Sequence, residues 1–283
     1  MKYGITGASG TLGRLTADAL LERVPAADVV LVTRDPSKLA AYAERGVEVR
    51  AGDFTDAATL DFSGIDRLLL ISLDTVGTRV EPQKAAIDAA VAAGVQRIAY
   101  TSVTNPSHSN PVFVAPDHRA TELHLFNSGA HWTVLRNAIY TEMYTLSAPG
   151  VLASGTIVTN AGDGLAVNVS RLDCADVAAA VLAGDDHDDK LYDITGEEAL
   201  NPDGLAALYT ELTGKPVSVQ QLDDAAWVAA MSAHMPEAGA QALATLGRAQ
   251  RLGYQATIST AVRDITGHAP RSLRDVLAPA LAG

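Results

Sequence analysis

Short apolar runs alternate with longer stretches of helical periodicity along the first half of the chain. The apolar runs predict buried β-strands, and the stretches between them predict helices that connect parallel strands. Gly46 and Gly94 precede the third and fifth runs, where a helix has to end before a strand begins. We therefore predict strands over 2–6, 29–33, 47–51, 67–71, 97–101 and 132–135, and helices over 11–24, 36–45, 57–60, 80–93 and 116–128.

The pattern changes after Arg136. Turn-rich stretches at 148–150 and 160–164 alternate with a predicted helix over 173–183 and a strand near 191–195, and helices dominate the remainder. Such a tail folds over the open end of a parallel sheet, where α/β proteins bind ligands. The sequence thus predicts an α/β fold: a Rossmann-type doubly wound parallel sheet over 1–136, and a smaller, mostly helical substrate lobe over 137–283 that is partly interleaved with it.

The composition of the chain argues against some classes of binding partner. The formal net charge of −12 works against nucleic acid and anionic membrane surfaces, so we expect neither. The longest aliphatic runs fall far short of the roughly 20 residues of a membrane-spanning helix. The single cysteine, Cys174, fits a reducing compartment and is expected to be buried. With the glycine loop following Met1 to Tyr3 directly, we expect no signal peptide and a cytoplasmic protein.

The strongest motif is a glycine loop between the first predicted strand and the first predicted helix. A glycine in first position permits a tight turn, the second lets the backbone approach a pyrophosphate, and the third lets the helix pack against the strand. The amino end of the helix attracts the phosphates. The loop predicts a bound nicotinamide dinucleotide and reads Gly7-Ala8-Ser9-Gly10-Thr11-Leu12-Gly13.

The residues after the second strand bear on which dinucleotide binds. Arg34 and Lys38 would pair with the 2′-phosphate of NADP(H), whereas Asp35 would favour NAD(H) if it faced the ribose instead. The local charge favours NADP(H), with NAD(H) as the weaker alternative. After the third strand, Asp53 and the adjoining Phe54 lie where a side chain commonly meets adenine, although Asp53 could equally cap the next helix.

A typical short-chain dehydrogenase carries Tyr-x-x-x-Lys after the fifth strand, where the lysine lowers the pKa of a proton-transferring tyrosine. No tyrosine in this chain has a lysine four residues on. Ser102 resembles the serine that accompanies this pair, but without its partners we expect it to stabilise a loop or contact the ligand. Alcohol–ketone chemistry and sugar epimerisation are therefore disfavoured.

These motifs together resemble the NmrA-like branch of the atypical short-chain reductases, and within it the type 2 NAD(P)H:quinone oxidoreductases and the triphenylmethane reductases. The resemblance spans nearly the whole chain. It rests on the glycine loop, on Arg34-Asp35-Pro36-Ser37-Lys38, on the stretches at 92–95 and 99–102, on Leu135-Arg136-Asn137-Ala138-Ile139-Tyr140, and on 161–164 and 173–180.

The resemblance implies roles for residues outside the glycine loop. Ser72, Leu73 and Asp74, together with Asn137 and Tyr140, would flank the nicotinamide and the acceptor. Arg171, just before the 173–183 helix, would approach the cofactor or close the site. Two departures bear on the acceptor: Gln83-Lys84 stands where relatives often have an asparagine, and Ile139 replaces an aromatic residue.

Quinone reduction fits the missing tyrosine and lysine. A quinone is electrophilic enough to take hydride directly, so the site needs mainly proximity and orientation. His118 is the candidate proton donor or substrate contact, since an imidazole titrates near neutral pH, although it could equally solvate a helix start. Tyr140 is the second catalytic candidate, although such a residue is more often a core or rim aromatic. The predicted partner is a small quinone- or dye-like molecule.

Three further alternatives stay open at this level. The chain could be a non-catalytic redox sensor that reports NADP(H) to a protein partner, without an acceptor pocket. Apolar positions over 85–93 fit either the core or a homodimer interface. The acidic run at 185–189 invites a metal hypothesis, but a solvated acidic turn is favoured and no metal site is predicted.

Overall fold

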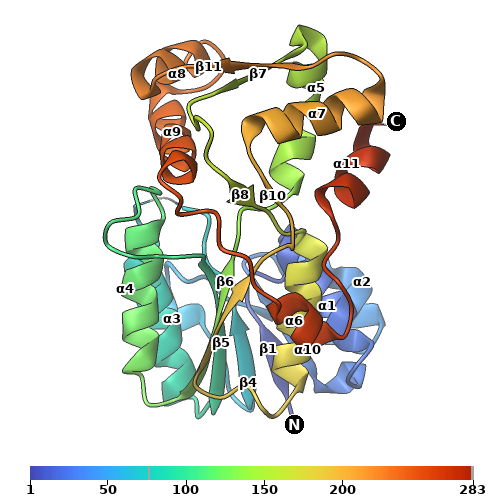
Figure 1. Ribbon diagram of the computed structural model, residues 1–283. Coiled ribbons are helices and arrows are strands. Elements are labelled where there is room, and N and C mark those ends of the chain that lie inside the picture. Colours follow the sequence, from blue (N-terminus) through green and yellow to red (C-terminus); the bar gives the residue numbers. More distant parts are fainter. Residues whose placement is uncertain (76, 282–283) are drawn as a thin grey trace.

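The computed structural model describes residues 1–75 and 77–281 and confirms the predicted Rossmann-type fold. Seven strands form one sheet, in which every neighbouring pair is parallel (Figure 1). The strand order reverses between the neighbours β1 and β4, which is where open α/β sheets bind ligands. In sheet order the strands are β3 (Glu48–Ala51), β2 (Val29–Thr33), β1 (Tyr3–Ile5), β4 (Arg67–Leu70), β5 (Arg97–Val103), β6 (His131–Asn137) and β9 (Lys190–Ile194).

Helices cover both faces of this sheet (Figure 1). On one face, an apolar cluster joins α1, α6 and α10 to β1 and β2. On the other, α3 packs beside α4, and Ala86, Ile87 and Ala90 of α3 are buried in the core. The helices of this unit are α1 (Thr11–Leu21), α2 (Ala40–Glu44), α3 (Val80–Ala92), α4 (Ala115–Phe126), α6 (Arg171–Ala183) and α10 (Ala261–Thr266).

A second unit lies beyond the carboxyl ends of the strands (Figure 1). It contains a parallel ribbon of β7 (Thr156–Thr159) with β11 (Ser218–Gln221), and an antiparallel one of β8 (Ala166–Val167) with β10 (Ala199–Leu200). The chain leaves the sheet after β6 and returns to it with α6, β9 and α10. The helices of the second unit are α5 (Glu142–Ser154), α7 (Pro202–Thr213), α8 (Asp224–Met231), α9 (Glu237–Arg251) and α11 (Leu273–Leu281).

The predicted turn at 148–150 is wrong, because α5 runs through Pro149 and Gly150. Proline inside a helix removes one backbone hydrogen bond and strains the preceding turn. Here tertiary packing outweighs that cost: Ala148, Val151 and Leu152 pack into an apolar cluster with α7 and α11. Pro149 itself is exposed, so its ring does not interrupt the packed face.

Two predicted helices are shorter than expected. The stretch 36–45 consists of a 3₁₀ segment (Pro36–Leu39) followed by the short α2, and Leu39, the last residue of the 3₁₀ segment, departs from helical geometry. The stretch 57–60 is a single 3₁₀ turn, Ala57–Thr59. The helix predicted over 173–183 starts two residues earlier, because Ser170 caps it by accepting the backbone N–H of Asp173. Arg171 is therefore the first residue of α6.

Within residues 1–75 and 77–281, none of the helices combines the length and the apolar composition needed to cross a membrane. Cys174 lies in α6, fully enclosed in the apolar cluster beneath α1. Burial raises the pKa of its thiol well above the ordinary value.

The segment between α10 and α11 is tied to α6 by a buried ion pair. Arg271 donates its backbone N–H to Asp173 Oδ2 at 2.9 Å, and its guanidinium pairs with Asp173 and with Asp176 Oδ2, the latter at 3.1 Å. The Asp173 side chain is 0% exposed, so its charge depends on these partners and on the Ser170 hydroxyl.

We expect Arg271→Ala to lower the free energy of unfolding by about 2 kcal/mol, because it leaves a buried carboxylate without its cationic partner. Urea unfolding measures the change. The matched control is Arg274→Ala, whose pair with Glu211 is largely exposed, and there the loss should stay below about 0.5 kcal/mol. Equal losses in the two variants would contradict a special role for the buried pair.

Candidate active site

A cleft of about 760 Å³ opens at the carboxyl ends of β1, β2, β4, β5 and β6. Its walls come from the loops that follow these strands and β3, and from α1, α4, α5, α6 and α9. Every predicted site residue except Ala8 lines it; Ala8 is fully buried beneath the glycine loop. The residues brought together are Gly7, Ser9, Gly10, Thr11, Leu12, Gly13, Arg34, Lys38, Asp53, Phe54, Ser72, Leu73, Asp74, His118, Asn137, Tyr140 and Arg171.

The glycine loop has the geometry that a phosphate site needs. Gly7 has φ +60°, a left-handed conformation that favours glycine. A Cβ on Gly13 would clash with the Gly7 carbonyl oxygen and lie 2.7 Å from Ala8 Cα, so glycine is required where α1 packs on the loop. At Gly10 the nearest protein atom to a Cβ would be the same carbonyl oxygen at 3.3 Å. The protein therefore leaves space above Gly10, at the open amino end of α1.

The first turn of α1 leaves its backbone N–H groups available. Gly10 occupies the cap position, no side chain caps the helix, and its first turn carries no acidic residue. Thr33 donates to Ser9 Oγ at 2.8 Å, which ties the loop to the end of β2. An unblocked helix amino end of this length carries a partial positive charge and favours an anion.

At one end of the cleft, Arg34 and Lys38 supply positive charge. Both are exposed and line the wall, and Arg34 makes no hydrogen bond or ion pair to any of the described residues. Asp35 does not line the cleft: it accepts the Ser37 N–H at 3.1 Å and the Ser37 hydroxyl at 2.5 Å, and these bonds lower its pKa. Asp35 is thus occupied as the cap of the 3₁₀ segment.

Asp53 and Phe54 lie beside Arg34 at the end of β3. Asp53 Oδ1 accepts the backbone N–H and the hydroxyl of Thr55 at 2.9 and 2.8 Å, and these bonds lower its pKa. The capping role that the sequence left open is therefore present, on one carboxylate oxygen. Phe54 is 7% exposed and packs in the core below α3, so it contributes an apolar floor.

At the other end of the cleft, the segment 72–74, Asn137 and Tyr140 line the wall. Asn137 donates from Nδ2 to the Tyr140 hydroxyl at 3.3 Å, while its Oδ1 is buried with no hydrogen-bond partner. The Arg171 guanidinium lies 4.5 Å from the centre of the Tyr140 ring. Burial raises the pKa of Tyr140, so its phenol stays protonated near neutral pH.

His118 lies at the same end, in the first turn of α4. It is 5% exposed, and its Nδ1 lies 2.9 Å from the Tyr100 hydroxyl. Burial, aided by the charge of Arg79, lowers the pKa of His118 to about 3. The imidazole is therefore neutral near pH 7 and remains available as a hydrogen-bond donor or acceptor, rather than as a cationic acid.

Ser102 lines the cleft, but its hydroxyl is occupied by a buried carboxylate. It donates to Glu122 Oε1 at 2.6 Å, and Arg136 binds both oxygens of the same buried carboxylate, at 2.9 and 2.6 Å. Within the described walls of the cleft, lysine occurs only at Lys38, at the opposite end. No lysine thus stands beside Tyr140 to lower its pKa.

The acidic run at 185–189 forms ion pairs. Asp185 pairs with Arg67 and lies 3.3 Å from Arg97, and Asp188 lies 2.9 Å from Arg97. Among the described residues, Asp173, Asp176 and His268 come within metal-ligand distance of one another, but Arg271 already bridges the two carboxylates.

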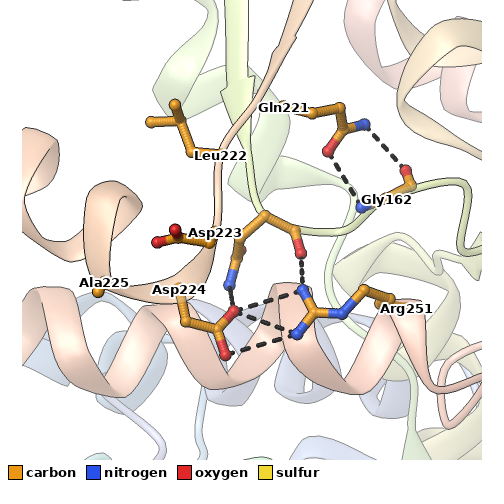
Figure 2. A pocket seen from close by; sticks show the side chains of 8 residues that line it. Gly162, Gln221, Leu222, Asp223, Asp224, Ala225 and Arg251 are labelled. Atoms are coloured by element: carbon orange, nitrogen blue, oxygen red, sulfur yellow. Dashed lines mark hydrogen bonds and ion pairs between the residues drawn. The ribbon is translucent and has the colours of Figure 1, made fainter.

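A second hollow, of about 640 Å³, lies on the outer lobe and is widely open to solvent. Its polar groups bind one another: Gln221 exchanges two hydrogen bonds of 3.0 Å with the Gly162 backbone, and Arg251 bridges Asp224 and the Asn160 carbonyl (Figure 2). The hollow shares no wall residue with the cleft. We interpret it as a brace between α8, α9 and the 160–164 loop.

Sequence reasoning missed several wall residues of the cleft. Arg79, Leu243 and Leu246 line it, and the buried Gln83 and Tyr100 stand directly behind His118. Leu243 and Leu246 belong to α9, far along the chain, and no local motif marks them. Only Gln83 carried a signal, as a departure from the pattern of related sequences.

Comparisons with known proteins agree with this geometry. A sequence profile of an NAD(P)H-binding family matches residues 7–185. Quinone oxidoreductase 2 of Escherichia coli (strain K12) is 37% identical over 274 residues, covering 96% of each chain. A (4-alkanoyl-5-oxo-2,5-dihydrofuran-3-yl)methyl phosphate reductase of Streptomyces griseus is 30% identical, covering 96% of this chain and 95% of that protein.

Solved structures give the same result. The NADPH complex of an NADPH-dependent quinone oxidoreductase from Escherichia coli superposes with a TM-score of 0.94 at 36% identity, covering 98% of this chain and 99% of the other. The NADP(H) complex of a Citrobacter sp. triphenylmethane reductase gives a TM-score of 0.93 at 31% identity, covering 99% and 100% of the two chains.

Proposed function

The chain belongs to the NAD(P)H-binding family, and we propose that it is an NADPH-dependent oxidoreductase that transfers hydride to a quinone or a similar flat, conjugated acceptor. The expected resemblance to the NmrA-like atypical short-chain reductases is confirmed. One observation carries the proposal: a single cleft runs from Arg34 and Lys38, past the open glycine loop, to the wall formed by Asn137, Tyr140 and His118.

The residues present fit NADP(H). The uncapped amino end of α1 and the space above Gly10 suit the pyrophosphate. Arg34 and Lys38 suit a 2′-phosphate, and Asp35, the residue that would favour NADH, is turned to Ser37. The buried, unpartnered Asn137 Oδ1 suits a carboxamide N–H of the nicotinamide.

The acceptor end offers an apolar site. A second cavity of about 280 Å³ adjoins the cleft beneath α9, and the two share Ile139, Met143, Leu243 and Leu246 as walls. A flat ring could stack at the nicotinamide end while its substituents extend toward this cavity. The redox-sensor alternative called for a nicotinamide end without an acceptor pocket, so we do not propose it.

The chemistry asks little of the protein beyond orientation. Bound NADPH would supply the hydride, and the protein would hold the acceptor against it and exclude water. Tyr140 and His118 are both uncharged near neutral pH and supply hydrogen bonds to the acceptor. Water can protonate a phenolate product, because a hydroquinone is a weak acid and its anion is released toward solvent.

The proposal predicts that the purified protein oxidises NADPH in the presence of benzoquinones, naphthoquinones or triphenylmethane dyes. The loss of NADPH absorbance measures turnover, with NADH assayed alongside. We expect kcat/KM to be at least about tenfold higher with NADPH than with NADH, from one charge-assisted contact to the 2′-phosphate. Absence of turnover with every acceptor, in a protein that binds NADPH tightly, would refute the proposal.

A further inference from the structure

His118 separates a buried tyrosine from the cleft. Tyr100 lies on β5, is fully buried and is not a wall residue, whereas His118 is. The hydroxyl of Tyr100 contacts His118 Nδ1 at 2.9 Å. The other ring nitrogen of His118, Nε2, makes no hydrogen bond to any described residue. Protein atoms do not cover it completely either, so a ligand can reach it. Nε2 is thus the nitrogen that remains for a ligand in the cleft.

The orientation of Gln83 determines which proton lies between Tyr100 and His118. Gln83 is fully buried on α3, and one amide atom lies 2.9 Å from the backbone nitrogen of Leu73. A backbone N–H can only donate, so the facing atom has to be the carbonyl oxygen Oε1. The amide nitrogen Nε2 therefore faces Thr121 Oγ1 at 2.8 Å and the Tyr100 hydroxyl at 3.3 Å, and donates to both.

The remaining protons follow from this assignment. The Tyr100 oxygen accepts from Gln83, so its own proton is free for His118 Nδ1. Thr121 accepts from Gln83 and donates to the Asp117 carbonyl at 3.0 Å, so it does not compete for Nδ1. An Nδ1 that accepts a hydrogen bond carries no proton, and the single proton of a neutral imidazole is then on Nε2.

Gln83 and Arg79 also bind Leu73, in the 72–74 segment of the cleft wall. Gln83 accepts the Leu73 N–H, and Arg79 donates to the Leu73 carbonyl at 2.9 Å and to Asp117 at 3.0 Å. The charge of Arg79 also disfavours a second proton on His118, whose pKa is about 3. Gln83 of α3 and Arg79, the cap residue of that helix, therefore hold both the 72–74 segment and the surroundings of His118 in place.

We propose that Gln83 and Tyr100 are positioning residues that fix His118 as the Nε2–H tautomer, and that this N–H binds the acceptor oxygen that becomes negatively charged during reduction. The inference rests on the proposed reductase function and deepens it. His118 acts as a neutral hydrogen-bond donor that keeps its proton. Its role is to stabilise charge that exists only after hydride has begun to move, which is what accelerates a reaction.

The overall step is balanced with the proposed reactants. The hydride leaves NADPH with two electrons, which oxidises the cofactor to NADP⁺ and reduces the acceptor to an anion. The anion takes one proton from water. No proton is withdrawn from His118, Tyr100 or Gln83, so the chain Gln83–Tyr100–His118 has the same protonation before and after turnover.

Nitrogen-15 NMR of histidine-labelled protein tests the tautomer. We expect the His118 signals, identified by their absence in His118→Gln, to show a protonated Nε2 and a bare Nδ1 between about pH 5.5 and 8.5. Tyr100→Phe should raise the population with Nδ1 protonated. The matched control is Tyr192→Phe, because Tyr192 forms a similar 3.0 Å contact with His187 Nδ1 outside the cleft. It should leave the His118 signals unchanged.

Kinetics with 1,4-benzoquinone tests the donor role. His118→Ala should lower kcat/KM for the quinone by about 10- to 30-fold, the loss of one neutral hydrogen bond, without changing the dissociation constant for NADPH. His118→Gln, which keeps a neutral N–H donor, should recover activity to within about threefold. Tyr100→Phe should fall between these variants. Across the same pH range the wild-type rate should show no ionisation attributable to His118.

Three results would overturn the inference. A protonated Nδ1 in the wild type would remove the donor from the cleft. Inactivity of His118→Gln equal to that of His118→Ala, with a rate that titrates near pH 6–7, would mark His118 as a proton-transfer group. A wild-type protein that binds NADPH but reduces no acceptor would overturn the proposed function and, with it, the donor role. A protonated Nδ1 alongside full activity would overturn only the inference.

Discussion

Replacing Gly10 by valine is expected to raise the dissociation constants of NADPH and NADH by at least about 100-fold while the chain remains folded. The backbone at Gly10 has φ −75° and ψ 170°, an extended conformation that valine adopts readily. The nearest protein atom to its Cβ would be the Gly7 carbonyl oxygen at 3.3 Å. The valine side chain would therefore fill the space above the amino end of α1, where the pyrophosphate is expected.

Isothermal titration measures the affinity, and thermal unfolding of the ligand-free protein checks that the fold is intact. Gly13→Ala is the matched comparison. There a Cβ would collide with the backbone of Gly7 and Ala8, so that variant should lose stability in the absence of any ligand. If Gly10→Val bound NADPH with wild-type affinity, the pyrophosphate would have to lie elsewhere.

The sheet could be predicted from the sequence because its signals are local. The central strands β2 and β4 are short, fully buried and mostly apolar runs, and turn residues such as Gly46 and Gly94, with φ +87° and +86°, precede β3 and β5. The structure begins β2 and α3 at the predicted residues, Val29 and Val80. Burial on both faces makes such strands continuously apolar, which separates them clearly from the amphipathic helices between them.

The structure of the second lobe is harder to predict from its sequence. Pro149 and Gly150 read locally as a turn, yet α5 continues through them because Ala148, Val151 and Leu152 pack against α7 and α11. β7 and β11 are parallel partners separated by some 60 residues, and their pairing depends on how the intervening α6 and β9 return to the sheet. Neither feature has a signature within a short window of sequence.

The two ends of the cleft also differ in how far the sequence predicts them. The glycine loop, Arg34 and Lys38 lie within one strand–helix–strand unit, so their spacing alone predicts that they face one ligand. The acceptor end is assembled from β5, α3, α4 and α9. That Gln83 contacts Tyr100, and Tyr100 contacts His118, depends on the packing of two helices against a strand. The sequence identifies His118 as a candidate site residue, but it does not indicate which ring nitrogen carries the proton.

Arg34 is expected to discriminate NADPH from NADH at its end of the cleft. Arg34→Glu should raise the dissociation constant of NADPH by about 100-fold, because it removes a charge-assisted hydrogen bond to the 2′-phosphate and places a like charge beside it. NADH, which lacks that phosphate, should bind within about threefold of its wild-type affinity. Fluorescence titration of both cofactors measures the ratio.

Arg23→Glu is the matched control, since it makes the same change in net charge just beyond the opposite end of α1, where the Arg23 guanidinium donates a hydrogen bond to the Ala19 carbonyl. It should leave both affinities unchanged, because exposed charges beyond about 10 Å are screened at physiological salt. Equal loss of NADPH binding in the two variants would indicate a general electrostatic effect. Loss of NADH and NADPH binding alike in Arg34→Glu would place Arg34 on a group that both cofactors share, and the discrimination between them would then have to come from Lys38.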